Sequence, residues 1–143
     1  MSEIPLNLET ANASIDELFA PFVKGLKPTI EAIGDGNVVI RMPYDDGLCR
    51  VGGIICGQAL MSLIDTCMVY VCFSGLGRFA EVTTVTQSTN FMRPVIARDV
   101  IATGRAVKAG RTLVFGEVVL TVDGDERPVC SGSSTYAVLP DRK

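Results

Sequence analysis

One carboxylate, Asp65, lies in the middle of the most apolar part of the sequence. It is the only charged residue at positions 51–77. The polar residues Gln58, Ser62 and Thr66 are spaced so that, on a helix, they would form one stripe with Asp65. A carboxylate inside a buried helix costs free energy unless another group pairs with it or uses it. Asp65 is therefore the first candidate for chemistry, and a carboxylate with a purely structural partner is the alternative.

The composition limits the chemistry in which Asp65 could take part, because none of the 143 residues is a histidine. Serine–histidine catalysis, cysteine–histidine catalysis and histidine-ligated metal sites are excluded. Proton transfer must then fall to a carboxylate, a cysteine, a tyrosine or a lysine. The five cysteines have no CxxC spacing and favour reduced thiols in a cytosolic protein over disulfides or a zinc site. We therefore expect no metal.

The overall composition is typical of a globular protein, with 48% hydrophobic and 20% charged residues, and the length predicts one domain over 1–143. A net charge of −3 without a basic patch gives no basis for binding nucleic acid. The first ten residues lack the basic and apolar regions of a signal peptide, so we expect a cytoplasmic protein. Residues 54–73 are apolar enough to suggest a membrane span. However, Asp65 near their centre would be costly in lipid, and strands follow instead of further spans.

The element that positions Asp65 is expected to be a helix at about 57–74, because this stretch is too long for a strand and contains no proline. Its apolar residues are spread round most of the helical circumference, which predicts a helix enclosed by protein. Gly75 and Gly77 would end the helix. The carboxylate would then belong to the central helix of the molecule.

The chain before this helix contains weaker signals. Residues 1–13 look like a loose arm, and the capping-box pattern at 14–17 predicts that a helix starts there. Pro21 falls inside the apolar run that follows, so this helix would be short or kinked. Residues 37–42 have the pattern of a strand, which Pro43 would end.

Everything after about residue 81 has the pattern of β-strands. Short turn signals separate the last three of the four runs, and connections of this length join antiparallel strands. The four runs cover residues 81–92, 98–108, 111–122 and 127–138. Gly104, Gly116 and Gly132 lie within these strands, where we expect them to make room for the central helix. The prediction is an α+β protein in which an antiparallel sheet of about five to six strands wraps one long helix, which is the hot-dog fold.

Four segments resemble, in the same order, the motifs of the hot-dog acyl-CoA thioesterases of the phenylacetate-pathway type, a family that includes the 4-hydroxybenzoyl-CoA thioesterases. The segments are CGQALMSLIDTC at 56–67, TVTQSTNFMRP at 84–94, VKAGRTL at 107–113 and TYAVLP at 135–140. The resemblance covers residues 37–139. It implies an acyl-CoA thioesterase that uses no cofactor apart from the coenzyme A of its substrate.

The resemblance implies catalytic roles for three residues. Asp65 would be the nucleophile or the base that activates water, and Thr84 would help to place that water. The backbone N–H of Gly57 would donate to the thioester carbonyl. Physical chemistry supports this last role independently, because the first turn of a helix has unpaired N–H groups and a partial positive charge.

Further residues are implied to lie near the substrate. Cys56 takes the place of the family's histidine, and Cys49, Arg50 or Val51 takes the place of a family asparagine or glutamine. Cys56 as the nucleophile is the alternative, since a helix N-terminus favours a thiolate. The other expected substrate contacts, the last three of them with the phosphates of coenzyme A, are Gln58, Arg93, Lys108 and Arg111. Lys108 and Arg111 flank a hairpin, where a solvated charge is the alternative.

The spacing of Gly57 and Asp65 has a consequence for assembly. They lie eight residues apart, which is about 12 Å along one helix. A catalytic carboxylate and an oxyanion donor must both come within roughly 3 Å of the same thioester. Two chains would therefore share each site, and the resemblance implies a dimer or a tetramer. The predicted function is acyl-CoA hydrolysis, and the alternative is a protein that binds or senses acyl-CoA without turning it over.

Overall fold

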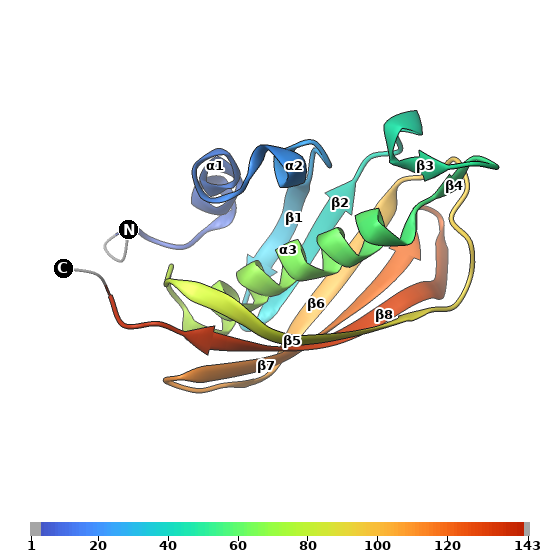
Figure 1. The fold of residues 1–143 in the computed structure, drawn as a ribbon. Coiled ribbons are helices and arrows are strands. Elements are labelled where there is room, and N and C mark those ends of the chain that lie inside the picture. The colour runs from blue at the N-terminus through green and yellow to red at the C-terminus, as the bar shows by residue number, and fades with distance from the viewer. Residues whose placement is uncertain (1–3, 142–143) are drawn as a thin grey trace.

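Figure 1 shows the computed structural model, which describes residues 4–141. Its elements, in chain order, are α1 (Leu8–Leu18), α2 (Pro21–Lys24), β1 (Thr29–Gly34), β2 (Asn37–Met42), the 3-10 helix η1 (Asp46–Leu48), β3 (Cys49–Arg50), β4 (Ile54–Ile55), α3 (Gly57–Leu76), β5 (Val82–Phe91), β6 (Val100–Ala109), β7 (Leu113–Val122) and β8 (Asp125–Val138).

A six-stranded sheet forms the larger layer, in the order β1-β2-β6-β7-β8-β5, and every neighbouring pair is antiparallel. Helix α3 lies along one face of this sheet (Figure 1). This arrangement confirms the predicted hot-dog fold and the four C-terminal strands. The sequence patterns do not predict β1, in which a glutamate and a glycine interrupt the apolar alternation, or the two-stranded ribbon of β3 and β4 before α3.

Helix α3 is the core helix of the molecule. It begins at Gly57, as predicted, and continues to Leu76, after which Gly77 adopts the left-handed conformation with φ of 74°. Among the described residues, α3 is the one helix long and apolar enough to cross a membrane, but 67% of its most apolar window is buried inside the protein. Its apolar character therefore belongs to the core, as the sequence indicates.

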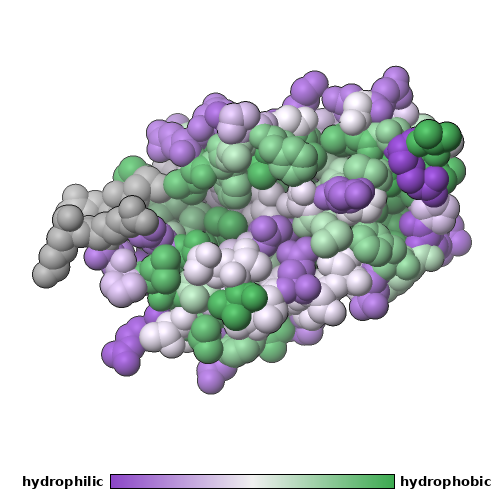
Figure 2. All heavy atoms as spheres, viewed as in Figure 1, coloured by the Kyte–Doolittle hydropathy of each residue, from purple (hydrophilic) through white to green (hydrophobic). Residues whose placement is uncertain are grey.

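One side of α3 is not covered by residues 4–141. Gln58 and Met61 are exposed, and Ser62 and Asp65 are half-buried. We call these four residues the open stripe of α3. The expected enclosure of the helix by protein therefore holds for most of its circumference but not for the open stripe. Figure 2 shows the helix side of the molecule, where hydrophobic and weakly polar residues surround small hydrophilic groups.

Three strand glycines let α3 lie close to the sheet, as predicted. A Cβ atom on Gly104 would come within 2.6 Å of Cγ2 of Val71, which belongs to α3. A Cβ atom on Gly116 would meet the end of the Met68 side chain at 2.7 Å, and Gly132 also has α3 atoms within 3 Å of that position. Each strand therefore needs a glycine where α3 crosses it.

Helix α1 begins earlier than the sequence pattern predicts. Asn7 caps it, because its side chain accepts a hydrogen bond from the N–H of Thr10 and its own N–H donates to the Thr10 hydroxyl, at 2.9 and 3.0 Å. The expected loose arm over 1–13 is therefore wrong for residues 8–13, while residues 1–3 lie outside the described part of the chain.

Side-chain hydrogen bonds attach α1 to the remainder of the molecule. The hydroxyl of Ser14, which the pattern suggested as the helix cap, is buried and lies 2.7 Å from the hydroxyl of Tyr70 in α3. The Asn12 amide donates to the carbonyl of Ile30 at 2.9 Å and accepts from its N–H at 2.8 Å, which covers the edge of β1. The short helix expected before Pro21 is confirmed, since Pro21 begins the separate helix α2.

The opposite edge of the sheet, β5, has no such cover. Its residues Val82–Phe91 include no charged residue and no proline, and within the described residues it pairs on one side only, with β8. Natural proteins usually protect a long edge strand with charges, prolines or a covering element. The edge of β5 therefore has the character of a strand that pairs with a further strand.

Replacing Gly104 by alanine should destabilise the fold, because the new methyl group meets the branched side chain of Val71, which is unable to move aside without changing rotamer. We expect a loss of about 1–3 kcal/mol in the free energy of unfolding, measured by urea denaturation. Gly116→Ala is the matched comparison, since the flexible end of Met68 can move, and it should cost less. Equal stability of the parent and Gly104→Ala would contradict the packing role of this glycine.

Candidate functional site

Two hydroxyl groups hold Asp65 at the open stripe. The hydroxyl of Thr84 donates to Oδ1 of Asp65 at 2.9 Å, and the phenol of Tyr136 donates to the same oxygen. The Tyr136 hydroxyl also lies 2.9 Å from the backbone carbonyl oxygen of Asp65. A cavity of about 300 Å³ lies beside the carboxylate, and Met61, Ser62, Asp65, Thr84 and Gln87 line it. We call it the carboxylate cavity.

Thr84 and Tyr136 reach the carboxylate because they face each other as cross-strand partners in β5 and β8. The register shifts between Thr84 and Thr86, so Val85 is an extra residue, a β-bulge. Without this residue, the alternation of the strand would turn Thr84 to the face of the sheet away from α3. The bulge therefore directs Thr84 toward Asp65.

Tyr136 is the site residue that the sequence analysis missed. Its side chain is buried, with 1% exposed. Burial and, to a lesser degree, the hydrogen bond to Asp65 raise the pKa of Tyr136 above that of an ordinary phenol, so it remains a neutral donor. The segment 135–140 was the available signal, but the direction of the side chain follows from the register of β8, which no local pattern shows.

The first turn of α3 presents free backbone donors. Cys56 is the N-cap, but its side chain makes no capping hydrogen bond, and the N–H groups of Gly57 and Gln58 have no acceptor among the described residues. A cavity of about 480 Å³ lies at this helix start, with Gly57, Phe91 and Arg50 among its lining residues. We call it the helix-start cavity. Its free N–H groups and the positive end of the helix suit a developing oxyanion.

The two cavities share no lining residue. Gly57 lies in the helix-start cavity and Asp65 in the carboxylate cavity, about 12 Å away along the helix. A single chain therefore does not bring the Gly57 N–H and the Asp65 carboxylate to one carbonyl group. The structure brings Asp65 and Thr84 into contact and keeps Gly57 apart from them.

Two predicted cations lie at the helix-start cavity. Arg50 is exposed there. Arg93 also lines the cavity, but its guanidinium donates to the carbonyl groups of Arg127 at 2.7 Å and Pro128 at 3.1 Å, and it lies 3.7 Å from Asp125. These contacts engage Arg93 in holding the start of β8, so Arg50 is the freer of the two cations.

The other two predicted cations lie far from the helix start. Lys108 and Arg111 are exposed at the hairpin between β6 and β7. This hairpin lies next to the end of α3, where a Cβ atom on Gly75 would come within 2.9 Å of Ala109. The distance from Gly75 to Gly57 is about 27 Å along the helix. Within one chain, these two cations therefore lie nearer to the Asp65 end of the open stripe.

The sequence matches a family of known proteins. The family model named thioesterase superfamily matches residues 52–129, which include the whole of α3 and most of the antiparallel sheet. The chain belongs to the thioesterase superfamily. It is therefore a hydrolase of the thioesterase class.

Three solved structures agree with membership of the thioesterase superfamily. A protein of Silicibacter sp., named as a thioesterase, is 30% identical with a TM-score of 0.84, and the match covers 97% of this chain and 96% of that one. A protein of Streptococcus pneumoniae, named as a thioesterase and solved with coenzyme A, is 25% identical with a TM-score of 0.72 over 81% and 88% of the two chains. The Escherichia coli PaaI protein of the phenylacetic acid degradation operon shares the fold, at 20% identity and a TM-score of 0.79 over 92% and 93%.

Cys56 takes the place of the histidine that the resemblance to the acyl-CoA thioesterases implies at this position. Its backbone N–H donates to the carbonyl of Leu48 at 2.8 Å, which fixes the chain as it enters α3. The side chain is half-buried. This thioesterase therefore has a backbone N–H at the helix start without the neighbouring imidazole.

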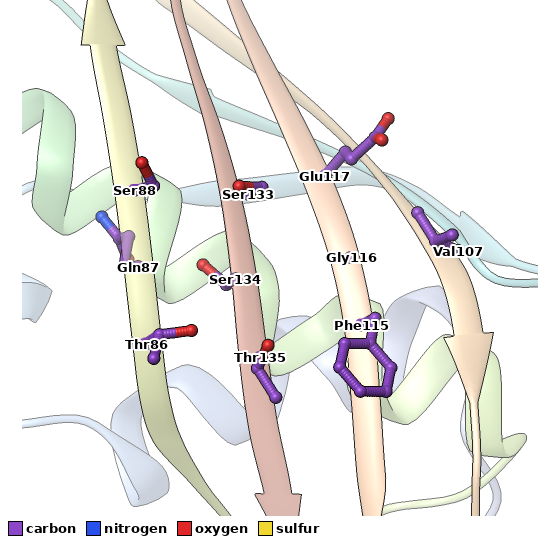
Figure 3. Close-up of a pocket in the computed structure, with 10 residues that line it drawn as sticks. All are labelled: Thr86, Gln87, Ser88, Val107, Phe115, Gly116, Glu117, Ser133, Ser134 and Thr135. Carbon is purple, nitrogen blue, oxygen red and sulfur yellow. The ribbon is translucent and has the colours of Figure 1, made fainter.

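A third hollow of about 340 Å³ lies on the other face of the sheet, and Figure 3 shows it with α3 behind the strands. Serine and threonine side chains line it in cross-strand pairs, with Thr86 beside Thr135 and Ser88 beside Ser133. Glu117 is the charged residue in its lining. This hollow contains neither a helix start nor an anchored carboxylate, so it is not the candidate catalytic site of the thioesterase.

Proposed function

We propose that the chain hydrolyses acyl-CoA thioesters at a site shared by two copies of the chain. Asp65 of one copy acts as the nucleophile or as the base that activates water, and the Gly57 N–H of the other copy donates to the thioester oxygen. One observation supports this most directly: a hydroxyl-anchored carboxylate and a free helix start lie on the same helix but in separate cavities. Each cavity alone lacks one of the two groups that acyl transfer needs.

The proposed reaction forms a C–O bond at the acyl carbon and breaks the C–S bond. Water attacks after Asp65 removes its proton, or Asp65 attacks first and water then hydrolyses the acyl-enzyme. The products are the carboxylic acid and coenzyme A, whose sulfur takes up a proton. Negative charge develops on the carbonyl oxygen, where the Gly57 N–H and the positive end of α3 would stabilise it. The hydroxyl of Thr84 donates a hydrogen bond to Asp65. Its oxygen keeps lone pairs that can accept a hydrogen bond from the attacking water.

The edge of β5 supports the association of two copies. A long, uncharged edge strand favours pairing with an equal strand, and a two-fold axis would place two β5 strands side by side. Val85, Phe91 and Met92 lie at or just after β5 with 55%, 53% and 51% of their surface exposed, and such pairing would cover part of this apolar surface. Because β5 also carries Thr84, pairing there would bring the two open stripes close together. We propose a dimer as the smallest active unit, either alone or within a tetramer.

The proposed substrate class rests on the family and on three exposed cations, of which Arg50 lines the helix-start cavity. The relative from Streptococcus pneumoniae was solved with coenzyme A. In a shared site, Arg50 would come from the copy that provides Gly57, while Lys108 and Arg111 would come from the copy that provides Asp65. These three cations are our candidates for the phosphates of coenzyme A. We also propose a cytoplasmic enzyme without a metal or an organic cofactor.

A protein that binds or senses acyl-CoA without hydrolysing it is the second candidate. Cys56 stands where the resemblance implies a histidine, and Cys49, Arg50 or Val51 takes the place of a family asparagine or glutamine. Both changes remove side chains that would polarise the carbonyl group together with the Gly57 N–H. They favour slow hydrolysis or none.

Asp65→Asn should lower hydrolysis by about 10²-fold or more, because the amide keeps the shape of the side chain but is neither a nucleophile nor a base. Thiol release from a panel of acyl-CoAs of different length and aromaticity measures this. Glu117→Gln is the control, since it removes a carboxylate from the other face of the sheet and should leave the rate unchanged. Turnover of Asp65→Asn within a few-fold of the parent would show that Asp65 is not catalytic. A parent that binds acyl-CoA but releases no thiol would support the binding protein instead.

Dialysis against a chelator should leave hydrolysis unchanged. The sequence contains no histidine, and over residues 4–141 no three cysteine, aspartate or glutamate side chains gather as metal ligands. The measurement is the rate of thiol release before and after dialysis. A rate that collapses after dialysis and recovers when zinc is added would refute the metal-free reaction.

A mixture of two inactive variants should regain activity if two chains share the site. Gly57→Pro removes the proposed oxyanion donor at the first position of a helix, where proline is tolerated, and Asp65→Asn removes the attacking group. Each mixed dimer then contains one doubly damaged site and one intact site. Random mixing makes about half of the dimers mixed, so roughly a quarter of the parental activity should return after co-expression.

Gly57→Ala is the matched control for this experiment. It adds a Cβ atom 3.3 Å from the Phe91 ring, as Gly57→Pro also does, but it keeps the N–H. It should therefore retain most of the activity. If proven mixed dimers of folded subunits stay inactive, each site takes both groups from one chain and the shared site is wrong.

A further inference from the structure

Both hydroxyl donors at Asp65 bond to the same carboxylate oxygen. Thr84 and Tyr136 each donate to Oδ1, while Oδ2 accepts no hydrogen bond from residues 4–141. The two oxygens are therefore unequal. Because Asp65 lines the carboxylate cavity, Oδ2 is the oxygen left to take a proton from water or to attack an acyl carbon.

The two donors differ in how tightly the surrounding structure restrains them. Tyr136 is buried, and its strand, β8, pairs with β7 on one side and β5 on the other. Thr84 is exposed in the edge strand. Close-packed surroundings leave a buried ring little freedom to move. The Tyr136 hydroxyl also contacts the carbonyl of Asp65 at 2.9 Å, so its position is fixed relative to the helix backbone as well as to the carboxylate.

We propose that Tyr136 is a positioning residue for this hydrolysis: its hydroxyl holds Oδ1 of Asp65 and leaves Oδ2 for the reacting atom. This inference rests on the proposed function, because Tyr136 acts through Asp65. Tyr136 lines neither cavity, so we do not expect it to touch the substrate. It also does not act as a base, since burial raises its pKa and keeps it protonated.

Few titratable groups lie near this pair. Apart from Asp65, the residues that line the carboxylate cavity do not titrate. Cys72 faces Tyr136 from α3, and burial raises the pKa of Cys72 to about 12, so its thiol is neutral. Loss of the Tyr136 hydroxyl should therefore leave Oδ1 of Asp65 held by Thr84 alone, with the carboxylate free to turn.

The test is Tyr136→Phe, which removes one hydroxyl and keeps the ring. We expect kcat to fall between about 10- and 100-fold, with KM changed by less than about twofold because Tyr136 does not touch the substrate.

Tyr70→Phe is the matched control. Tyr70 is the other buried tyrosine, and it belongs to α3. Its hydroxyl bonds to Ser14 and not to Asp65. Tyr70→Phe should lower the melting temperature but leave kcat and KM unchanged. If Tyr136→Phe keeps kcat within about twofold of the parent while Asp65→Asn abolishes turnover, the role of Tyr136 is wrong and the proposed function stands.

The split between kcat and KM separates this inference from the proposed function. A parent that hydrolyses no thioester overturns the hydrolytic role of both residues. A Tyr136→Phe variant that raises KM and leaves kcat unchanged overturns the positioning role of Tyr136 even in an active enzyme. If Tyr136→Phe does not fold, incorporation of 3-fluorotyrosine keeps the shape and makes the phenol a stronger donor. The value of kcat should then change while KM stays within about twofold of the parent, and an unchanged kcat would refute the proposal.

Discussion

The close approach of α3 to the sheet is the constraint on which the other features depend. Gly104, Gly116 and Gly132 leave room where the helix crosses three adjacent strands, and Val71 and Met68 fill that room from the helix side. A layer of methyl groups there would lift α3. A hydrogen bond weakens when its two atoms move apart by a few tenths of an ångström. The hydrogen bonds from Thr84 and Tyr136 in the sheet to Asp65 in α3 would therefore weaken too. The packing of the core thus sets the geometry of the site.

The sequence predicts the central helix and the four C-terminal strands because their patterns are long and regular. Gly57 starts α3 as expected, and the separation of Gly57 from Asp65 needs only the rise of a helix. The N-terminal helix begins at a different place because two capping patterns compete. Asn7 with Thr10 forms the cap, while Ser14 is buried against another helix. Contacts between distant segments decide such cases, and local patterns do not contain them.

The site shows the same division between local and distant information. Asp65 and the helix start are visible in one stretch of sequence, so their candidacy needs no structure. Tyr136 is different, because its contact with Asp65 depends on the order of strands and on the register of β8 against β5. Arg93 is a further example. Its sequence position suggests a phosphate contact, but its guanidinium donates to backbone carbonyl groups at the start of β8. Side-chain direction in a sheet is a property of the assembled fold.

The bulge at Val85 makes β5 change parity along its length. Before it, Thr84 faces α3 from an even position, and beyond it Gln87 and Phe91 face the same side from odd positions. Deletion of Val85 would restore a regular pleat and turn Thr84 away from Asp65. A length change of one residue in β5 therefore alters which side chains face α3, whereas the neighbouring hairpin loops can absorb insertions and deletions.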